Sequence, residues 1–188
     1  MNHNITVRIF FRSLILPLNE IDEVLPQSGK IFDLGCGEGV ISKYLAQNTK
    51  RIVIGVDSDG KRLPKSTQKN LTFTMGDIRK YNVKNADVVI ISDVLHHIRF
   101  KDQEKVLKNA TRGLSKGGLL VIKEIDTQEF LRSAMSRFWD FIFYPKEKIY
   151  FNNAKEFETK LTSLGFNVKV KRTTRLFPGS TTLFIARK

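Results

Sequence analysis

A glycine-rich segment, residues 35–39, separates an apolar run from a helical pattern. The run before it, Lys30–Leu34, has the composition of a short buried strand, and Val40–Ala46 places apolar side chains on one helical face. Glycines let a backbone turn tightly and approach a ligand where a Cβ atom would collide. A strand, a glycine turn and a helix in this order predict a ligand site at the carboxyl edge of an open α/β sheet.

Strands and helices alternate along the 188 residues. Strands are predicted at Lys30–Leu34, Arg51–Val56, Leu71–Met75, Ala86–Ser92, Leu119–Ile125, Phe166–Val170 and Thr182–Ala186. Helices are predicted at Val40–Ala46, Asp102–Leu114 and Glu156–Leu164. The alternation predicts a parallel, doubly wound sheet, and the length and the lack of a linker predict one domain, 1–188.

The residues around the glycine segment narrow the class of ligand. Asp57 ends the second predicted strand, where an acid can accept hydrogen bonds from both ribose hydroxyls. A dinucleotide fingerprint would place its third glycine where Val40 stands. Asp33, just before the segment, suits a ligand with a positively charged amino group better than a pyrophosphate. The alternative is a structural glycine turn with Asp57 as a helix cap.

The segment Asp33–Gly39, DLGCGEG, resembles the first motif of class I S-adenosylmethionine (SAM)-dependent methyltransferases. Later segments follow in the family's order: Gly55–Ser58, Gly76–Ile78, Asp87–His97 and Leu114–Gly118. The resemblance implies an α/β, Rossmann-like seven-stranded, mostly parallel sheet with helices on both faces and the last strand antiparallel. It also implies SAM as the cofactor and S-adenosyl-L-homocysteine as its product.

The resemblance assigns cofactor contacts to individual residues. In the predicted sheet they are Asp33, Gly35, Cys36, Gly37, Asp57, Ser58, Asp77, Ile78, Ser92 and Asp93. Among them, Asp57 holds the ribose, Asp77 meets the adenine amino group and Ile78 lines the adenine ring. Asp93 is expected either at the methionyl end of SAM or in the turn after the fourth predicted strand. A helix within residues 1–25 is expected to cover the cofactor, with Arg12 at the SAM carboxylate.

Two histidines, His96 and His97, follow the fourth predicted strand at the rim where an acceptor would face the cofactor. Histidine titrates near neutral pH, so either ring is a candidate base for an acceptor that must lose a proton. The alternative is that the rings only pack or bond to the backbone. Asp126 is a second candidate base. No metal site is expected, because a single cysteine excludes a multi-cysteine zinc site.

Gly60 and Pro64 follow the second predicted strand and predict a short or irregular helix there. The segment 127–155 is predicted to be a substrate lid. The helical pattern Asp126–Tyr144 ends in aromatic residues on more than one side, and Ile5–Leu18 is apolar on more than one face. These segments favour a hydrophobic or amphiphilic, lipid-like acceptor, with ordinary core packing as the alternative.

The charge is strongly positive: 32 Lys and Arg against 19 Asp and Glu give +13. Such a balance favours anionic surroundings, although a basic chain with no anionic partner is the alternative. No segment reaches the ~20 apolar residues that span a membrane. We therefore expect a cytoplasmic protein, a monomer or homodimer, with peripheral contact at the anionic inner face of the membrane. Nucleic acid is the less favoured partner, because the turn at 92–97 lacks an Asn/Asp-Pro-Pro-aromatic tetrapeptide.

Together these patterns predict a SAM-dependent methyltransferase that acts on a small hydrophobic or amphiphilic acceptor. Two alternatives stay open on the sequence alone. One is an RNA or DNA methyltransferase, which the charge permits. The other is a non-catalytic, SAM-binding scaffold protein, because cofactor binding does not prove turnover.

Overall fold

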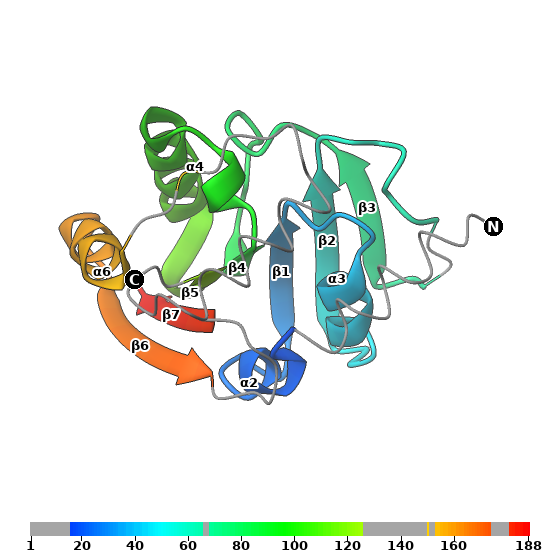
Figure 1. Cartoon of the computed structure of the whole chain (residues 1–188). Coiled ribbons are helices and arrows are strands. Elements are labelled where there is room, and N and C mark those ends of the chain that lie inside the picture. Colours follow the sequence, from blue (N-terminus) through cyan, green and yellow to red (C-terminus); the bar gives the residue numbers. More distant parts are fainter. Residues whose placement is uncertain (1–15, 66–67, 126–149, 151–152, 174–180) are drawn as a thin grey trace.

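The computed structural model describes residues 16–65, 68–125, 150, 153–173 and 181–188. Within them, seven strands form one sheet in the order β3-β2-β1-β4-β5-β7-β6 (Figure 1). The strands are β1 (Gly29–Leu34), β2 (Arg51–Asp57), β3 (Leu71–Met75), β4 (Ala86–Ser92), β5 (Leu114–Ile125), β6 (Asn167–Thr173) and β7 (Thr181–Arg187). Only β7 runs antiparallel to its neighbours, β5 and β6. The predicted fold class is confirmed.

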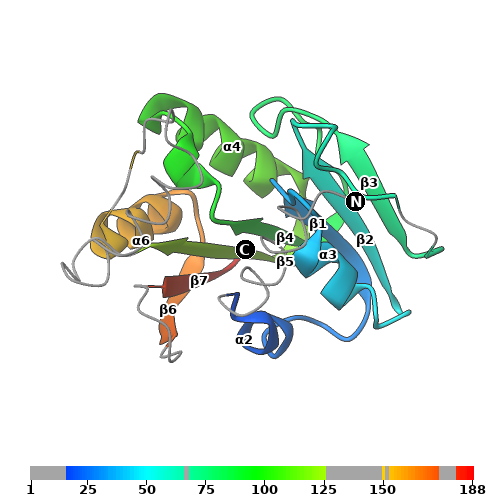
Figure 2. The ribbon, with the colours of Figure 1, turned by 45° about the vertical axis from the view of Figure 1, so that its right-hand side comes forward.

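Helices cover both faces of the sheet (Figure 2). On one face lie α2 (Leu18–Asp22) and α3 (Val40–Leu45), and on the other α4 (Phe100–Gly113) and α6 (Ala154–Ser163). Each face has its own apolar core, which contains Ile21 and Leu45 on the first and Leu107 and Phe157 on the second.

The middle strand β4 contributes side chains to both cores, because successive side chains of a strand point to opposite faces of the sheet. Val88 and Ile90 belong to the core beneath α2 and α3, while Val89 and Ile91 belong to the core beneath α4 and α6. All four side chains are fully buried. A parallel strand that is buried on both faces needs apolar side chains at nearly every position. The apolar run in the sequence therefore predicted the bounds of β4 correctly.

The junction between α4 and β5 differs from the prediction. The sequence predicted a helix that ends at Leu114 and a strand that begins at Leu119. Instead, β5 already begins at Leu114, and its pairing with β4 jumps from Ala86↔Leu114 to Val88↔Leu119. The extra residues form a bulge, in which Gly117 has a φ of 76°.

The connections on either side of β3 contain no helix in the parts described, 58–65, 68–70 and 76–85. The first agrees with the effect expected of Gly60 and Pro64. Because no helix in these connections covers the β2–β3 side of the sheet, the side chains of Ile52 and Met75 remain 57% and 68% exposed.

Several predicted features lie outside the described residues. They are Arg12 and most of the N-terminal cover segment, Asp126, and most of the lid at 127–155. The part of the cover segment that is described includes α2, and its Ile21 is fully buried against the sheet. In the portion of the chain that the structure covers, no helix is both long enough and apolar enough to cross a membrane.

Candidate functional site

The glycine loop begins where β1 ends. The backbone N–H groups of Gly35 and Cys36 both donate to the carbonyl of Val56, at 2.7 and 3.0 Å, so the loop is tied to β2. Gly35 has a φ of 80°, and a Cβ atom there would lie 2.3 Å from a methyl group of Val94. Gly39, at a φ of 71°, would place a Cβ atom 2.5 Å from the Phe73 ring. At both positions the conformation and the space require glycine.

Asp57 holds the loop from the end of β2. It is buried, and its Oδ2 accepts a hydrogen bond from the Gly37 N–H at 2.8 Å, while its Oδ1 accepts from the Asp59 N–H at 2.9 Å. Carboxylate oxygens have further lone pairs, so these bonds leave acceptor capacity for ribose hydroxyls. Asp57 therefore has a structural role in holding the loop, and this role does not use up the acceptor capacity of its carboxylate.

Asp33 and Ser92 line a small hollow beside the glycine loop, together with Gly35 and Leu16. Asp33 is 2% exposed, and its Oδ2 accepts a hydrogen bond from Ser42 Oγ at 2.5 Å. Ser92 is 4% exposed, and its Oγ has no hydrogen-bond partner among the described residues. Burying a hydroxyl without a partner costs free energy, so a ligand that bonds Ser92 fits this place. The amino group of SAM has that chemistry.

Asp77 follows β3 and is engaged by Arg79. The Arg79 Nε lies 2.8 Å from Asp77 Oδ1, and its Nη2 lies 2.7 Å from Oδ2. The hydrogen bonds from this guanidinium hold the pKa of Asp77 below its ordinary value. Ile78 is buried in the core beneath α4, and Ser58 is exposed.

A second ion pair, which the sequence analysis did not foresee, crosses the glycine loop. Glu38 in the loop is buried, and its two carboxylate oxygens lie 3.3 and 3.2 Å from Nε and Nη2 of Arg62. Arg62 belongs to the helix-free segment after β2. The pair therefore fastens that segment to the loop on the side where a ribose would meet Asp57.

A histidine–carboxylate pair stands at the ends of β4 and β5. His96 lies in the short helix η1 (Leu95–His97), is 2% exposed, and has Nδ1 2.6 Å from Oε2 of Glu124. The other oxygen of Glu124 accepts a hydrogen bond from the Leu95 N–H at 2.9 Å. The His97 ring is adjacent, with the two ring centroids 4.2 Å apart.

Glu124 was not among the residues predicted from the sequence. The available signal was that β4 and β5 are parallel neighbours, so an acid at the end of β5 lies beside the turn after β4. The structure pairs Ser92 with Lys123, which places Glu124 one residue beyond that register.

Asp93 was predicted as a cofactor contact, and the structure pairs it with Lys123. The Lys123 Nζ lies 2.6 and 2.7 Å from the two carboxylate oxygens, and the side chain of Lys123 is 4% exposed. Asp93 also has a φ of 54°, and its N–H donates to the Lys123 carbonyl at 3.0 Å. A buried ammonium group needs such a partner.

The predicted site residues that the structure describes lie at one edge of the sheet. The glycine loop follows β1, Asp57 ends β2 and Asp77 lies just after β3 (Figure 1). Ser92 ends β4, and Asp93 and His96 follow it. This is the edge where open α/β sheets bind ligands. Cys36 is buried there with Sγ near the backbone of Gly37, and burial, with the nearby charges of Asp33 and Asp57, raises the pKa of its thiol.

A family model described as "Methyltransferase domain" matches residues 6–169. The chain belongs to this methyltransferase family. The predicted membership, fold and enzyme class are thereby confirmed, and SAM as cofactor agrees with solved members of the fold in complex with SAM or S-adenosyl-L-homocysteine.

Curated relatives of this methyltransferase carry the name carboxy-S-adenosyl-L-methionine synthase. The protein from Actinobacillus succinogenes is 30% identical over 112 residues, which cover 54% of this chain and 46% of the relative. The protein from Alteromonas mediterranea is 28% identical over 128 residues, 61% of this chain and 52% of the relative. The chain spans about half the length of the curated relatives it matches.

Solved structures share the fold over nearly the whole chain. A SAM-dependent methyltransferase from Archaeoglobus fulgidus has a TM-score of 0.74 at 17% identity, covering 97% of this chain and 99% of its own. A possible histamine N-methyltransferase from Thermotoga maritima has a TM-score of 0.75 at 19% identity, with 96% and 91% covered. At these identities the likeness establishes the fold of this methyltransferase and leaves its acceptor open.

Proposed function

We propose that this methyltransferase moves a methyl group from SAM to a small, hydrophobic or amphiphilic acceptor, and that His96 takes a proton from that acceptor. The observation that carries the proposal is the contact between His96 and Glu124 at the carboxyl edge of the sheet. When bound, SAM supplies an electrophilic methyl group on a sulfonium. The chain must then hold the two reactants in line and accept the proton that the acceptor releases.

Glu124 supports the role of His96 by fixing the ring. A carboxylate at Nδ1 favours the tautomer with its proton on that nitrogen, which makes Nε2 the nitrogen that accepts a proton. The carboxylate also stabilises the imidazolium that forms. Its second oxygen is held by the Leu95 N–H, so the acid cannot rotate away without breaking that bond.

The cofactor would be held by residues on three strands. Asp57 would accept from the ribose, while Ser92 and Asp33 would meet the amino group of SAM. Asp93 is already paired with Lys123, so we assign it the positioning of the turn after β4 and not a direct bond to SAM. The sequence left two roles open for Asp93, at the methionyl end of SAM or in the turn itself, and this assignment takes the second.

An aromatic pair close to His96 supports an apolar acceptor. Phe100 is 49% exposed and packs edge-on against Tyr150, with the ring centroids 5.6 Å apart. The Tyr150 N–H donates to the carbonyl of His96 at 2.7 Å, so this pair is attached to the helix that carries the base. Exposed aromatic rings at the rim of a site favour a ligand with an apolar part.

We further propose that the reaction takes place in the cytoplasm, with peripheral contact at an anionic membrane. The charge of +13 supports attraction to anionic headgroups. Flotation with vesicles of phosphatidylglycerol and, separately, of phosphatidylcholine tests this point. Equal recovery with both vesicles would remove the support for membrane contact.

The proposed reaction is tested by release of S-adenosyl-L-homocysteine in a screen of lipids and small amphiphiles with a hydroxyl or amino group. We expect turnover with at least one acceptor, whose mass increases by one methyl group, and loss of that turnover in His96→Asn. Mass spectrometry of the SAM-derived product distinguishes the activity that the relatives' name describes. If the protein forms carboxy-S-adenosyl-L-methionine and no methylated acceptor, the proposed methyl transfer is wrong.

A further inference from the structure

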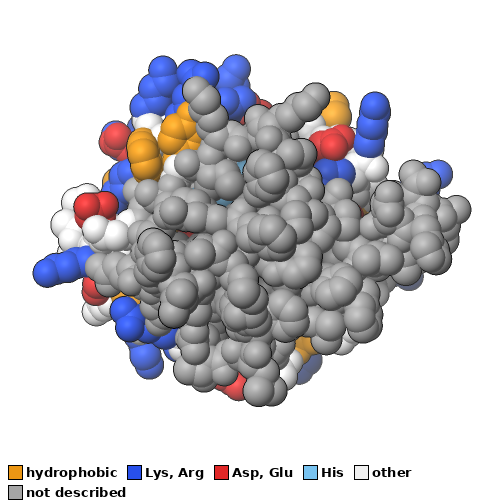
Figure 3. Space-filling model, in the orientation of Figure 1, with side chains coloured by type: hydrophobic (Ala, Val, Ile, Leu, Met, Phe, Trp, Pro, Cys, Tyr) orange, Lys and Arg blue, Asp and Glu red, His pale blue; other side chains and the backbone are white. Residues whose placement is uncertain are grey.

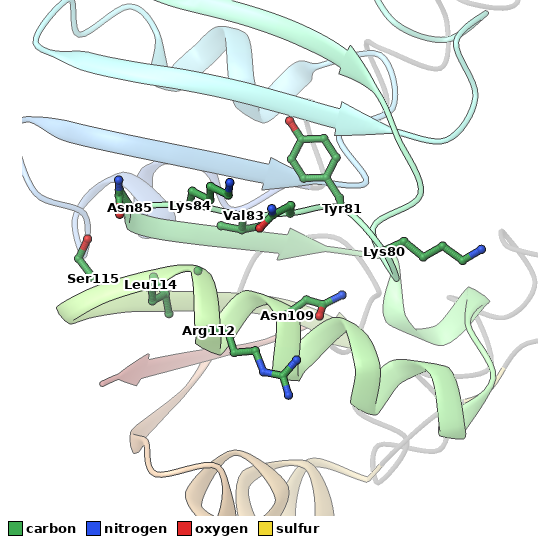
Figure 4. A pocket seen from close by; sticks show the side chains of 11 residues that line it. Lys80, Tyr81, Val83, Lys84, Asn85, Asn109, Arg112, Leu114 and Ser115 are labelled. Atoms are coloured by element: carbon green, nitrogen blue, oxygen red, sulfur yellow. The ribbon is translucent and has the colours of Figure 1, made fainter.

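A cavity of about 540 Å³ lies on the α4 face of the sheet, away from the glycine loop. One wall is the segment 80–85 and the other is the C-terminal part of α4 (Figure 4). Asn85 and Ser115 stand at the end where β4 and β5 begin, and Lys80 extends outward at the opposite end. Parallel strands place their ligand edge at the carboxyl ends, so this cavity is distinct from the SAM site.

The cavity is open because the connection between β3 and β4 contains no helix, which leaves a trough beside α4. Two contacts join its walls. Asn109 Nδ2 donates to the Arg79 carbonyl at 2.7 Å, and a Cβ atom at Gly113 would lie 2.4 Å from Val83. The walls are therefore in close contact beneath the cavity and keep its shape.

Three cationic side chains line the cavity: Lys80, Lys84 and Arg112. None of the lining residues is Asp or Glu. In the ion pairs of the described residues, these three cations have no carboxylate partner. Asn85 and Ser115 add neutral polar groups. Figure 3 shows Lys and Arg side chains gathered at the part of the surface where α4 lies.

The end of α4 would by itself oppose an anion, because the last carbonyls of a helix carry partial negative charge. Lys188 cancels this effect. Its Nζ donates to the carbonyls of Thr111 and Leu114, at 2.8 and 3.2 Å. A fourth cation is thus placed behind the cavity wall, and the carbonyls that would repel an anion are occupied.

We propose that this cavity binds a phosphate-bearing ligand, with Arg112 on one wall and Lys84 on the other as its main contacts (Figure 4). A guanidinium fork suits two oxygens of a phosphate group, and Lys84 adds a separate point charge on the opposite wall. The volume is in the range of small-molecule sites and exceeds that of a single phosphate group. The site needs neither SAM nor His96, so it stands independently of the proposed methyl transfer. A soluble phosphate ester and a phospholipid headgroup share this chemistry.

Isothermal titration with inorganic pyrophosphate tests the soluble source, and sedimentation with vesicles of phosphatidic acid or phosphatidylcholine tests the lipid source. Three proteins are compared: the unchanged chain, Lys84→Gln/Arg112→Gln, and the control Lys155→Gln/Lys169→Gln. The control removes the same charge from exposed positions on α6 and β6. We expect saturable binding that weakens about 10-fold or more in the cavity variant and is unchanged in the control.

The two arms assign the source. Pyrophosphate binding supports a soluble ligand, and binding only to phosphatidic acid vesicles supports a lipid headgroup. No binding in either arm, or an equal loss in both double variants, would overturn the proposal. SAM titration of the cavity variant gives an independent check of its folding, because its affinity for SAM is expected to be unchanged.

Discussion

The carboxylate of Glu124 contacts His96 and the backbone of Leu95 at once, through Oε2 at 2.6 Å and Oε1 at 2.9 Å. One oxygen therefore orients the imidazole while the other fixes the start of the helix that carries it. The acid comes from β5 and the histidine from the turn after β4, so the sheet itself sets the geometry of the pair. Such support from a neighbouring element is what a general base needs for a defined orientation.

Glu124→Gln is expected to lower kcat by about 10²-fold, because an amide does not stabilise an imidazolium. SAM affinity is expected to stay unchanged, since the amide oxygen can still accept from the Leu95 N–H. Steady-state release of S-adenosyl-L-homocysteine and SAM titration measure the two effects. Glu158→Gln on α6 is the matched control, and an equal kcat in both variants would refute the positioning role.

Asp57→Asn is expected to weaken SAM binding by roughly 10- to 100-fold, the value of one or two hydrogen bonds to a charged acceptor. The amide also loses one of the two carboxylate oxygens that hold the Gly37 and Asp59 N–H groups. Isothermal titration with SAM measures the change. Asp87→Asn, at the opposite edge of the sheet, should bind SAM like the unchanged chain; the assignment fails if the two variants behave alike.

Lys123→Met is expected to reduce the free energy of unfolding by about 3 kcal/mol, because it removes the buried ammonium group that pairs with Asp93. Adding Asp93→Asn should recover part of that loss, since the carboxylate that lost its ammonium partner is then neutral. Urea unfolding of the two variants gives the comparison. A double variant less stable than Lys123→Met would show that the charge of Asp93 is not the cause.

Cys36 is expected to react slowly with a thiol reagent while the protein is folded. Burial, first, and the charges of Asp33 and Asp57 raise the pKa of its thiol, and only the thiolate reacts readily. Absorbance with a chromogenic disulfide measures the rate at neutral pH, with and without denaturant. Equal rates in the two conditions would contradict this environment.

The ion pair of Asp77 and Arg79 predicts a pH dependence. Because Arg79 lowers the pKa of Asp77, the contribution of the pair is present above the ordinary value of 3.8 and is lost as pH falls through the lowered pKa. Arg79→Gln should move the Asp77 titration midpoint upward, toward 3.8. Carbon NMR of the carboxyl group follows the midpoint, with Arg112→Gln as the control that should leave it in place.

The sequence predicted the bounds of two strands correctly. Ala86–Ser92 and Leu71–Met75 begin and end where their composition indicated, since strand composition is a local property. The bulge at the start of β5 was not predicted, because it depends on how that strand pairs with β4. Pairing is a long-range property that the sequence of one strand does not contain.

In the candidate site, too, local features were predictable from the sequence and long-range contacts were not. The glycine loop and Asp57 were predictable, because their spacing along the chain is part of the motif. The pair of Glu38 and Arg62 was not, because it joins residues 24 apart across two loops. Likewise, the partner of His96 could be found only once β5 was known to lie beside β4.

The position of β7 has a consequence for the synthesis of this protein. β7 follows β6 in the chain but lies between β5 and β6 in the sheet. Among the described strands, β6 pairs only with β7. On the ribosome, β1 to β5 can assemble first, whereas β6 has no partner until β7 has been translated. During that interval the edge of β5 is open to pairing with foreign strands, so the risk of mispairing is greatest until β7 has been translated.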